Sequence, residues 1–145
     1  MEQPKQQDVR LQRCLTIAND VEEVPRMSEF IAAFCEESGL DMSATMRLNL
    51  AIEEAVVNVI AYAYPPGRPG VVTVEAASGS DFITFVIRDN GVPFDPTAKG
   101  EVDTTLPVEE RPIGGLGIHL VRQIVDDISY QRLGDQNVLT IGKKL

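Results

Sequence analysis

The chain has 145 residues, enough for one domain with a sizeable core. Its 43% hydrophobic content is typical of a soluble globular protein, and its net charge of −9 argues against a nucleic-acid-binding surface. Every apolar run is shorter than the roughly 18 residues of a membrane span. The polar start MEQPKQQDVR carries no secretion signal, so we expect a cytoplasmic protein that binds neither nucleic acid nor membrane.

The cysteines Cys14 and Cys35 have neither a metal-ligand nor a redox spacing. We expect two buried thiols in preference to a disulfide.

The N-terminal half predicts a strand followed by two helices. Apolar and polar residues alternate over residues 9–17, as in a half-buried strand. Residues 21–40 place apolar side chains at helical spacing and end at Gly39. A longer helix is expected to begin near Ser43 and to end before the Pro-Pro-Gly sequence at residues 65–67.

The C-terminal half predicts two hairpins separated by a loop and a helix. Residues 70–78 and 81–89 are rich in strand-forming residues and are expected to pair. Residues 92–113 contain four prolines and show no period, which predicts a long loop. Apolar residues recur at helical spacing in residues 114–129, and residues 130–145 are expected to form the closing hairpin.

This order of elements predicts an α+β fold in one domain. Strands lie next to strands and helices next to helices along the chain, which favours a two-layer α/β sandwich: a mostly antiparallel sheet with three helices on one face. A doubly wound parallel sheet would need strict alternation of strands and helices. Residues 1–8 are expected to be disordered.

The second helix carries the first candidate site. Glu54 and Asn58 lie nearly opposite its expected core face, yet apolar residues surround them. Either both side chains face water or the helix has a pocket face, where a Glu could act as general base and an Asn oxygen could bind Mg²⁺. The core face is expected to contain Leu48, Ile52, Ala55, Val56, Val59 and Ala63.

The second candidate site is Asp89-Asn90-Gly91, where an apolar strand stops. Asp can cap a turn, and Asn-Gly is a common turn pair. Val92 and Pro93 lead into the loop and not into a partner strand, which argues against a tight hairpin. A carboxylate beside a glycine would alternatively suit a flat ligand that donates an N–H group, such as adenine.

The third candidate site is the GGLG sequence at residues 114–117, which opens the last helix. Glycines at a helix N-terminus let backbone N–H groups approach a phosphate, although they also serve simple turns between a loop and a helix.

In combination, these three sites resemble the GHKL ATP-binding (Bergerat) fold, and within it the anti-sigma-factor serine kinase family. EEAVVNVIAYAY resembles the family's N box, with Glu54 and Asn58 at its E-x-x-x-N positions. DNGVPFDP resembles its first glycine box, GGLGIHLVRQIVDDISY its second, and NVLTIGKKL its closing strand.

The resemblance implies a role for each matching residue. Glu54 would be the catalytic base towards a serine hydroxyl, and Asn58 would hold Mg²⁺. Asp89 would accept the adenine amino group, with Gly91 letting the base approach.

The resemblance also implies that residues 92–113 form a lid over the phosphates, with Gly115 and Gly117 at its phosphate end. The family often has an arginine just before its second glycine box, where this chain has Ile113, and Arg111 is the candidate to replace it. Asn137 stands roughly where the family has a threonine.

The implied function is that of an ATP-dependent serine/threonine kinase, using Mg²⁺ and releasing ADP. Its substrate would be a serine of an anti-anti-sigma-type protein. It would also act as an anti-sigma factor in a partner switch, with a sigma factor as second partner and a homodimer as its state. Two alternatives are a nucleotide-binding regulator without transfer activity and a detached histidine-kinase catalytic domain; for the latter, only His119 is present, and we expect it on the surface.

Overall fold

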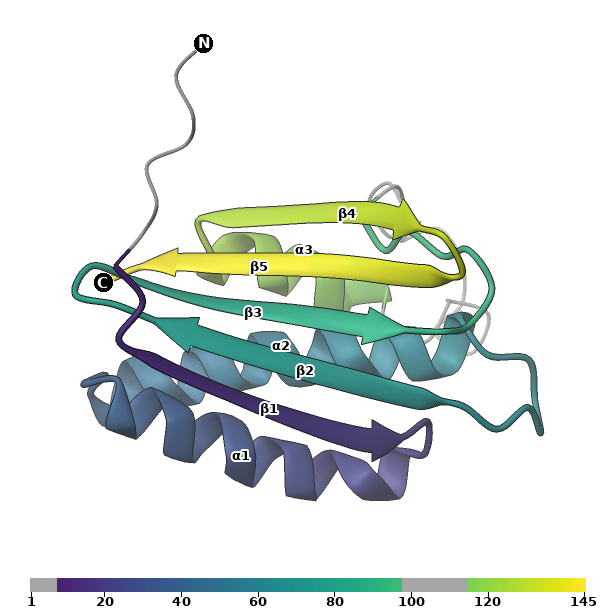
Figure 1. Cartoon of the computed structure of the whole chain (residues 1–145), viewed down its shortest axis with the longest axis horizontal. Coiled ribbons are helices and arrows are strands. Elements are labelled where there is room, and N and C mark those ends of the chain that lie inside the picture. Colours follow the sequence, from purple (N-terminus) through teal and green to yellow (C-terminus); the bar gives the residue numbers. More distant parts are fainter. Residues whose placement is uncertain (1–7, 98–114) are drawn as a thin grey trace, which may run out of the picture.

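The computed structural model describes residues 8–97 and 115–145, with the side chains of the second range described from His119 onwards. It shows a five-stranded antiparallel sheet with three helices packed on one face (Figure 1). The predicted two-layer α+β sandwich is confirmed.

The sheet has the strand order β1-β2-β3-β5-β4, and every neighbouring pair is antiparallel. Side chains alternate between the helix-covered face and the open face, because successive residues of a strand point to opposite sides. On β3, for example, Ile83, Phe85 and Ile87 are buried, while the residues between them are half-buried. The strands are β1 (Leu11–Ala18), β2 (Val71–Ser78), β3 (Phe82–Asp89), β4 (Asp127–Leu133) and β5 (Gln136–Lys144).

The helices begin and end at residues with recognisable local chemistry. Gly39 follows the first helix with a φ of 91°, a conformation that glycine adopts without strain. The side chain of Asp41 accepts a hydrogen bond from the backbone N–H of Ala44 and so caps the second helix. A 3₁₀ turn, η1 (Val21–Glu23), precedes α1 (Val24–Glu37), which is followed by α2 (Met42–Tyr62) and, later in the chain, α3 (Gly115–Ile124).

The core lies between the helices and the sheet. The predicted core face of α2 is confirmed, because all six of its residues are buried. Phe34 of α1 and Phe85 of β3 meet edge to face, with ring centroids 5.9 Å apart. Helix α2 lies between α1 and α3 and packs against both. The two flanks of α2 therefore pack against α1 and α3, and its inner face packs against the sheet.

The prediction for the third helix is wrong at its C-terminal end. The helix was expected to continue to residue 129, but it ends at Ile124, and Asp127 begins strand β4. Ile128 fits the helical stripe, yet residues 127–133 alternate between exposed and half-buried side chains because they pair with β5 at the sheet edge. Ile128 still packs against the core, now from a strand.

The predictions for the two cysteines, for the N-terminal segment and for the lid have different outcomes. Both cysteines are free, but only Cys35 is buried; Cys14 is exposed on β1, so the expectation of two buried thiols is wrong for it. Burial raises the pKa of the Cys35 thiol to about 11. Disorder was expected for residues 1–8 and a lid for residues 92–113; residues 1–7 and 98–113 of these segments lie outside the described residues. In the described part of the chain, no helix has the length and apolarity that crossing a bilayer requires.

Candidate functional site

Helix α2 presents Glu54 and Asn58 one turn apart, in its C-terminal half. Asn58 is 4% exposed, whereas Glu54 is half-buried. The Asn58 side-chain Nδ2 donates a hydrogen bond of 2.7 Å to the backbone oxygen of Glu54, which sets the orientation of the amide. Its other atom, Oδ1, accepts no hydrogen bond from any residue that the structure describes. The local fold thus leaves a hard oxygen ligand beside a carboxylate.

Asp89 ends strand β3 with its carboxylate buried, at 2% exposure. One carboxylate oxygen, Oδ1, accepts hydrogen bonds from the Gly91 backbone N–H at 2.9 Å and from the Asn137 Nδ2 at 2.8 Å. Within the described ranges, no group donates to the second oxygen, Oδ2. One oxygen therefore holds the fold, while the other keeps its capacity to accept a hydrogen bond from a ligand.

The environment of Asp89 raises the pKa of its carboxyl above the ordinary value. Burial is the main cause, since it disfavours the charged form. The hydrogen bonds from Asn137 and Gly91, and the positive charge of Arg132, lower the pKa but do not cancel this effect.

Asn137 is the residue that organises this end of the sheet, and it is directly opposite Asp89 in the pairing of β3 with β5. Its Nδ2 also donates to the backbone oxygen of Val92 at 2.8 Å. Its Oδ1 accepts from the Phe94 backbone N–H at 3.1 Å, and from two side chains of β4, Arg132 and Tyr130. The buried side-chain amide of Asn137 therefore connects β3, β4 and β5 with the start of the loop that follows β3.

Sequence reasoning placed Asn137 where the family has a threonine but did not foresee this network. Arg132, which donates to the Gly91 backbone oxygen at 3.0 Å, was also missed. The available signal was a polar residue at the head of the apolar run NVLTI, in the strand expected to close the sheet.

The turn after Asp89 confirms the structural interpretation of Asp89-Asn90-Gly91, and the ligand interpretation stays a prediction. Asn90 has a structural role: its Oδ1 lies 2.6 Å from the Tyr64 hydroxyl, and that hydroxyl accepts from the Asn90 backbone N–H at 3.0 Å. The Asp89–Gly91 hydrogen bond closes the turn. The turn thus accounts for Asn90 and for one oxygen of Asp89, and the second oxygen is left over.

Gly91 has a packing reason to be glycine. A Cβ atom placed there would lie 2.2 Å from the backbone oxygen of Ala63, at the C-terminal end of α2. The same oxygen accepts a hydrogen bond of 2.8 Å from the Val92 backbone N–H. The end of α2 and the end of β3 are consequently in backbone contact. The expectation that Gly91 also lets a base approach stays a prediction.

This contact orders the candidate residues along α2. With a rise of 1.5 Å per residue, Asn58 lies about 7 Å along the helix axis from Ala63, and Glu54 about 13 Å. Asn58 therefore lies closer along α2 to the turn after Asp89 than Glu54 does.

The remaining candidates are less fully described. Gly115 and Gly117 lie in the first turn of α3, which packs against α2. The helix start expected at the GGLG sequence is thus present beside the helix that carries Glu54 and Asn58. Arg111 lies outside the described residues.

The chain matches known proteins over most of its length. Residues 17–143 match the family described as histidine kinase-like ATPase domain. A serine/threonine-protein kinase, BtrW, of Bordetella bronchiseptica is 31% identical over 101 residues, which cover 68% of this chain and 71% of the relative. A serine-protein kinase, RsbW, of Listeria monocytogenes is 30% identical over 115 residues, covering 76% and 73%. The RsbW of one Bacillus cereus strain is 27% identical over 127 residues, covering 80% and 79%.

The match begins at the end of β1, contains all three helices, strands β2 to β4 and nearly all of β5, and includes every candidate residue. It confirms the resemblance that the N box and glycine-box motifs indicated. The chain belongs to the histidine kinase-like ATPase domain family, and the relatives named above are serine or serine/threonine kinases.

Proposed function

We propose that this protein is an ATP-dependent serine/threonine kinase, which transfers the γ-phosphoryl group of ATP to a serine of an anti-anti-sigma-type partner protein. The observation that carries the proposal is that the two carboxylate oxygens of Asp89 differ in their hydrogen bonding. Its Oδ1 is held by Asn137 and Gly91, and its Oδ2 meets no donor among the described residues. The exocyclic amino group of adenine is a donor of the kind this oxygen can accept.

The order of residues along α2 supports the same assignment. If the base of ATP binds at Asp89, its phosphates have a path along α2 past Asn58 towards Glu54. Gly115 and Gly117 lie in the N-terminal turn of α3, and α3 packs against α2. Backbone N–H groups at a helix N-terminus favour phosphate oxygens, and glycine lets such an anion approach closely.

Asn58 is suited to Mg²⁺. No cluster of three His, Cys, Asp or Glu side chains able to hold a metal occurs among the described residues. Mg²⁺ often takes few protein ligands and draws the others from phosphates and water, and the Oδ1 of Asn58 is an oxygen without a hydrogen-bond donor in the described part of the chain. When bound there, the ion would neutralise charge on the phosphates.

In the proposed transfer, Glu54 accepts the proton of the substrate serine hydroxyl. The serine oxygen forms a bond to the γ-phosphorus, and the bond between this phosphorus and the β–γ bridging oxygen breaks. ADP leaves with that electron pair, and phosphoserine remains on the partner. The chain itself contributes mostly positioning and charge stabilisation, as is usual in phosphoryl transfer.

Two kinds of support bear on the partners. The relatives named above are serine kinases by name, which favours a protein serine as acceptor. The motif resemblance favours an anti-anti-sigma-type substrate, a sigma factor as the second partner of the switch, and a homodimer. We include these partners in the proposal.

A phosphotransfer assay tests the assignment of Glu54. With labelled ATP, Mg²⁺ and a candidate partner, Glu54→Gln is expected to slow phosphoserine formation by roughly 10² to 10⁴, because the substrate proton loses its acceptor. The affinity for ADP should stay near that of the parent, since Glu54 lies about 13 Å along the α2 axis from Ala63, the residue that contacts the turn after Asp89. Glu53→Gln is the matched control: the adjacent glutamate is also half-buried, and its variant should keep most of the activity.

Two outcomes would count against the proposal. If Glu54→Gln transfers phosphate at the parent rate, Glu54 is not the base. If the parent binds ADP but phosphorylates none of its binding partners, the protein is a nucleotide-dependent regulator without transfer activity.

A further inference from the structure

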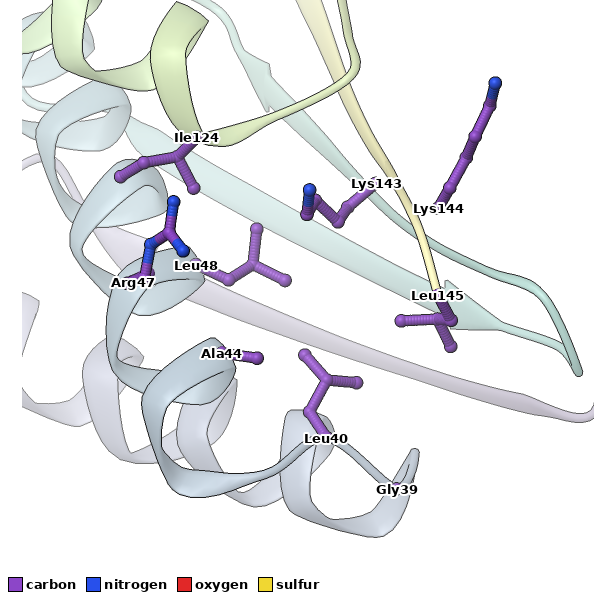
Figure 2. A pocket seen from close by; sticks show the side chains of 9 residues that line it. All are labelled: Gly39, Leu40, Ala44, Arg47, Leu48, Ile124, Lys143, Lys144 and Leu145. Atoms are coloured by element: carbon purple, nitrogen blue, oxygen red, sulfur yellow. The ribbon is translucent and has the colours of Figure 1, made fainter.

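A mostly apolar pocket of about 310 Å³ opens at the end of the molecule where α2 begins (Figure 2). Its walls come from four separate segments: the turn between α1 and α2, the first turns of α2, the end of α3 and the end of β5. The lining residues are Gly39, Leu40, Ala44, Arg47, Leu48, Ile124, Lys143, Lys144 and Leu145.

This pocket is distinct from the candidate nucleotide site. Leu48 is the most buried of the α2 residues that line the pocket, at 2% exposure. It lies ten residues before Asn58, which is about 15 Å along the helix axis. β3 and β5 are antiparallel, and Lys144 at the end of β5 pairs with Phe82 at the start of β3, so the pocket lies at the opposite end of these strands from Asp89. A ligand in this pocket would therefore not occupy the space assigned to ATP.

The rim is basic, which runs against the balance of the whole chain. Three lining residues have basic side chains and none has an acidic side chain, although the chain has 22 acidic and 13 basic residues; the negative charge in the lining is the α-carboxylate of Leu145, the last residue of the sequence. Arg47 flanks the pocket from α2 and Lys143 from β5 on the facing side, whereas Lys144 points away from it (Figure 2). The rim therefore offers two cationic groups to one ligand.

These two groups have few partners within the protein. Arg47 takes part in none of the ion pairs among the residues that the structure describes. The Nζ of Lys143 is 3.8 Å from the Asp126 Oδ2, at the limit of an ion pair. That carboxylate oxygen already accepts a hydrogen bond of 2.6 Å from the Lys144 backbone N–H. Arg47 in particular keeps its donors for an external anion.

We propose that the pocket binds a small amphipathic carboxylate, that is, a monocarboxylic acid with an aliphatic or aromatic body. The apolar body would pack against Leu40, Leu48 and Ile124. The carboxylate would lie at the rim, where Arg47 and Lys143 can donate charge-assisted hydrogen bonds. An apolar interior with a few polar groups that orient the ligand is the usual composition of small-molecule sites.

The dimensions and lining exclude other classes of occupant. The volume is at the small end of the range for small-molecule pockets, and a helix about 10 Å across would not enter it. A phosphate or sulfate ion would leave the apolar walls unused. A neutral hydrocarbon would fill the walls but gain nothing from the cations.

Octanoate is a suitable probe, and three relatives of it separate the two parts of the site. Binding to the full chain is followed by NMR chemical shifts or by calorimetry. Octanoate is expected to shift resonances of the pocket residues with a saturable affinity. Octanol, which lacks the charge, and acetate, which lacks the apolar body, should bind at least about fivefold more weakly. Octylammonium should not bind, because its charge meets Arg47 and Lys143.

Three variants test the residues. Arg47→Gln and Lys143→Gln should each weaken octanoate binding about fivefold, since each removes a charged hydrogen-bond donor. Lys144→Gln makes the same charge change on a side chain that points away, and should leave the affinity within about twofold. Ala44→Trp, which fills the pocket from α2, should abolish octanoate binding while ADP still raises the melting temperature as in the parent, which shows that the variant folds.

The proposal is overturned if octanoate does not bind, if octanol binds as tightly as octanoate, or if Lys144→Gln weakens binding as much as Lys143→Gln. None of these outcomes depends on kinase activity, so they leave the proposed function untouched.

Discussion

Asp89 combines a structural role in the fold with the role in nucleotide binding that we propose for it. Its Oδ1 closes a turn through Gly91 and joins two strands through Asn137. Keeping the carboxylate buried opposes its ionisation, and its pKa is accordingly raised. A charged acceptor held in this way, with one oxygen lacking a donor among the described residues, is more easily explained by ligand binding than by stability alone.

Asp89→Asn separates these two roles. The amide oxygen can still accept the hydrogen bonds from Gly91 and Asn137, so the fold should persist. Nucleotide binding should be lost, because the amide NH₂ would face the adenine amino group as a second donor. Calorimetry with ADP and Mg²⁺, together with chemical denaturation of the unliganded protein, measures both effects. Parent-like ADP affinity would remove Asp89 from the nucleotide site.

The pH dependence of stability gives a further check on Asp89. A raised pKa means that the folded state binds the proton more readily, so the contribution of Asp89 to the free energy of unfolding is greatest below the ordinary pKa of about 3.9 and is lost as the pH rises through the folded value. The gain in stability of Asp89→Asn over the parent should therefore be larger at neutral pH than near pH 4. Denaturation curves at both pH values measure it, and an equal difference would mean that Asp89 titrates normally.

At the scale of elements, α2 does most of the positioning. It presents the N-box residues, contacts the end of β3 through Ala63 and lines the apolar pocket with Ala44, Arg47 and Leu48. Its start depends on Asp41, whose side chain accepts from the Ala44 backbone N–H at 2.8 Å. A change at this cap acts on the whole helix and not on the chemistry of either site.

Asp41→Ala is therefore expected to lower the free energy of unfolding by about 1 kcal/mol, the usual effect of losing an N-cap. Asp41→Asn keeps an oxygen that can cap the helix and should cost much less. Urea denaturation of both variants distinguishes the cap from the charge. Equal losses would mean that the negative charge near the helix N-terminus, and not the hydrogen bond, provides the stabilisation.

The elements also show what could be predicted from the sequence. Helices α1 and α2 and the first hairpin follow local patterns strongly enough to be placed within a few residues, and the N-box spacing predicted Glu54 and Asn58 as neighbours on one helix, which the structure confirms. The end of α3 was misplaced because Ile128 satisfies both a helical stripe and a strand, and pairing with β5 decides between them. The role of Asn137 was missed for the same kind of reason, since its partner Asp89 is 48 residues away in the chain. Contacts that depend on pairing distant strands leave no local pattern.

At the scale of the whole molecule, the two ends of the sheet carry different chemistry. One end gathers Asp89, Asn137 and the C-terminal half of α2, and the other encloses an apolar pocket with a basic rim. The core between them contains residues of α2 from Leu48 to its C-terminal end. A ligand that binds only the folded protein should therefore stabilise it as a unit.

ADP with Mg²⁺ provides the test. At a ligand concentration about 100 times the dissociation constant, mass action adds about 2.7 kcal/mol, which should raise the melting temperature by about 5 to 10 °C. Replacing the magnesium salt by EDTA should reduce the rise, and Asp89→Asn should abolish it, whereas Glu54→Gln should keep it. No rise at millimolar ADP in the parent would contradict nucleotide binding.

The asymmetry of the Asp89–Asn137 pair has one more consequence. If the two residues were interchanged, an aspartate at position 137 would have no N–H to give to the Val92 carbonyl, which the present Nδ2 supplies at 2.8 Å. It would also draw the guanidinium of Arg132, now 3.2 Å from the Asn137 Oδ1, into a salt bridge. The swap therefore cannot be silent, even though it conserves composition and volume. The direction of the hydrogen bonds across the strands therefore requires the acid at position 89 and the amide at position 137, independently of nucleotide binding.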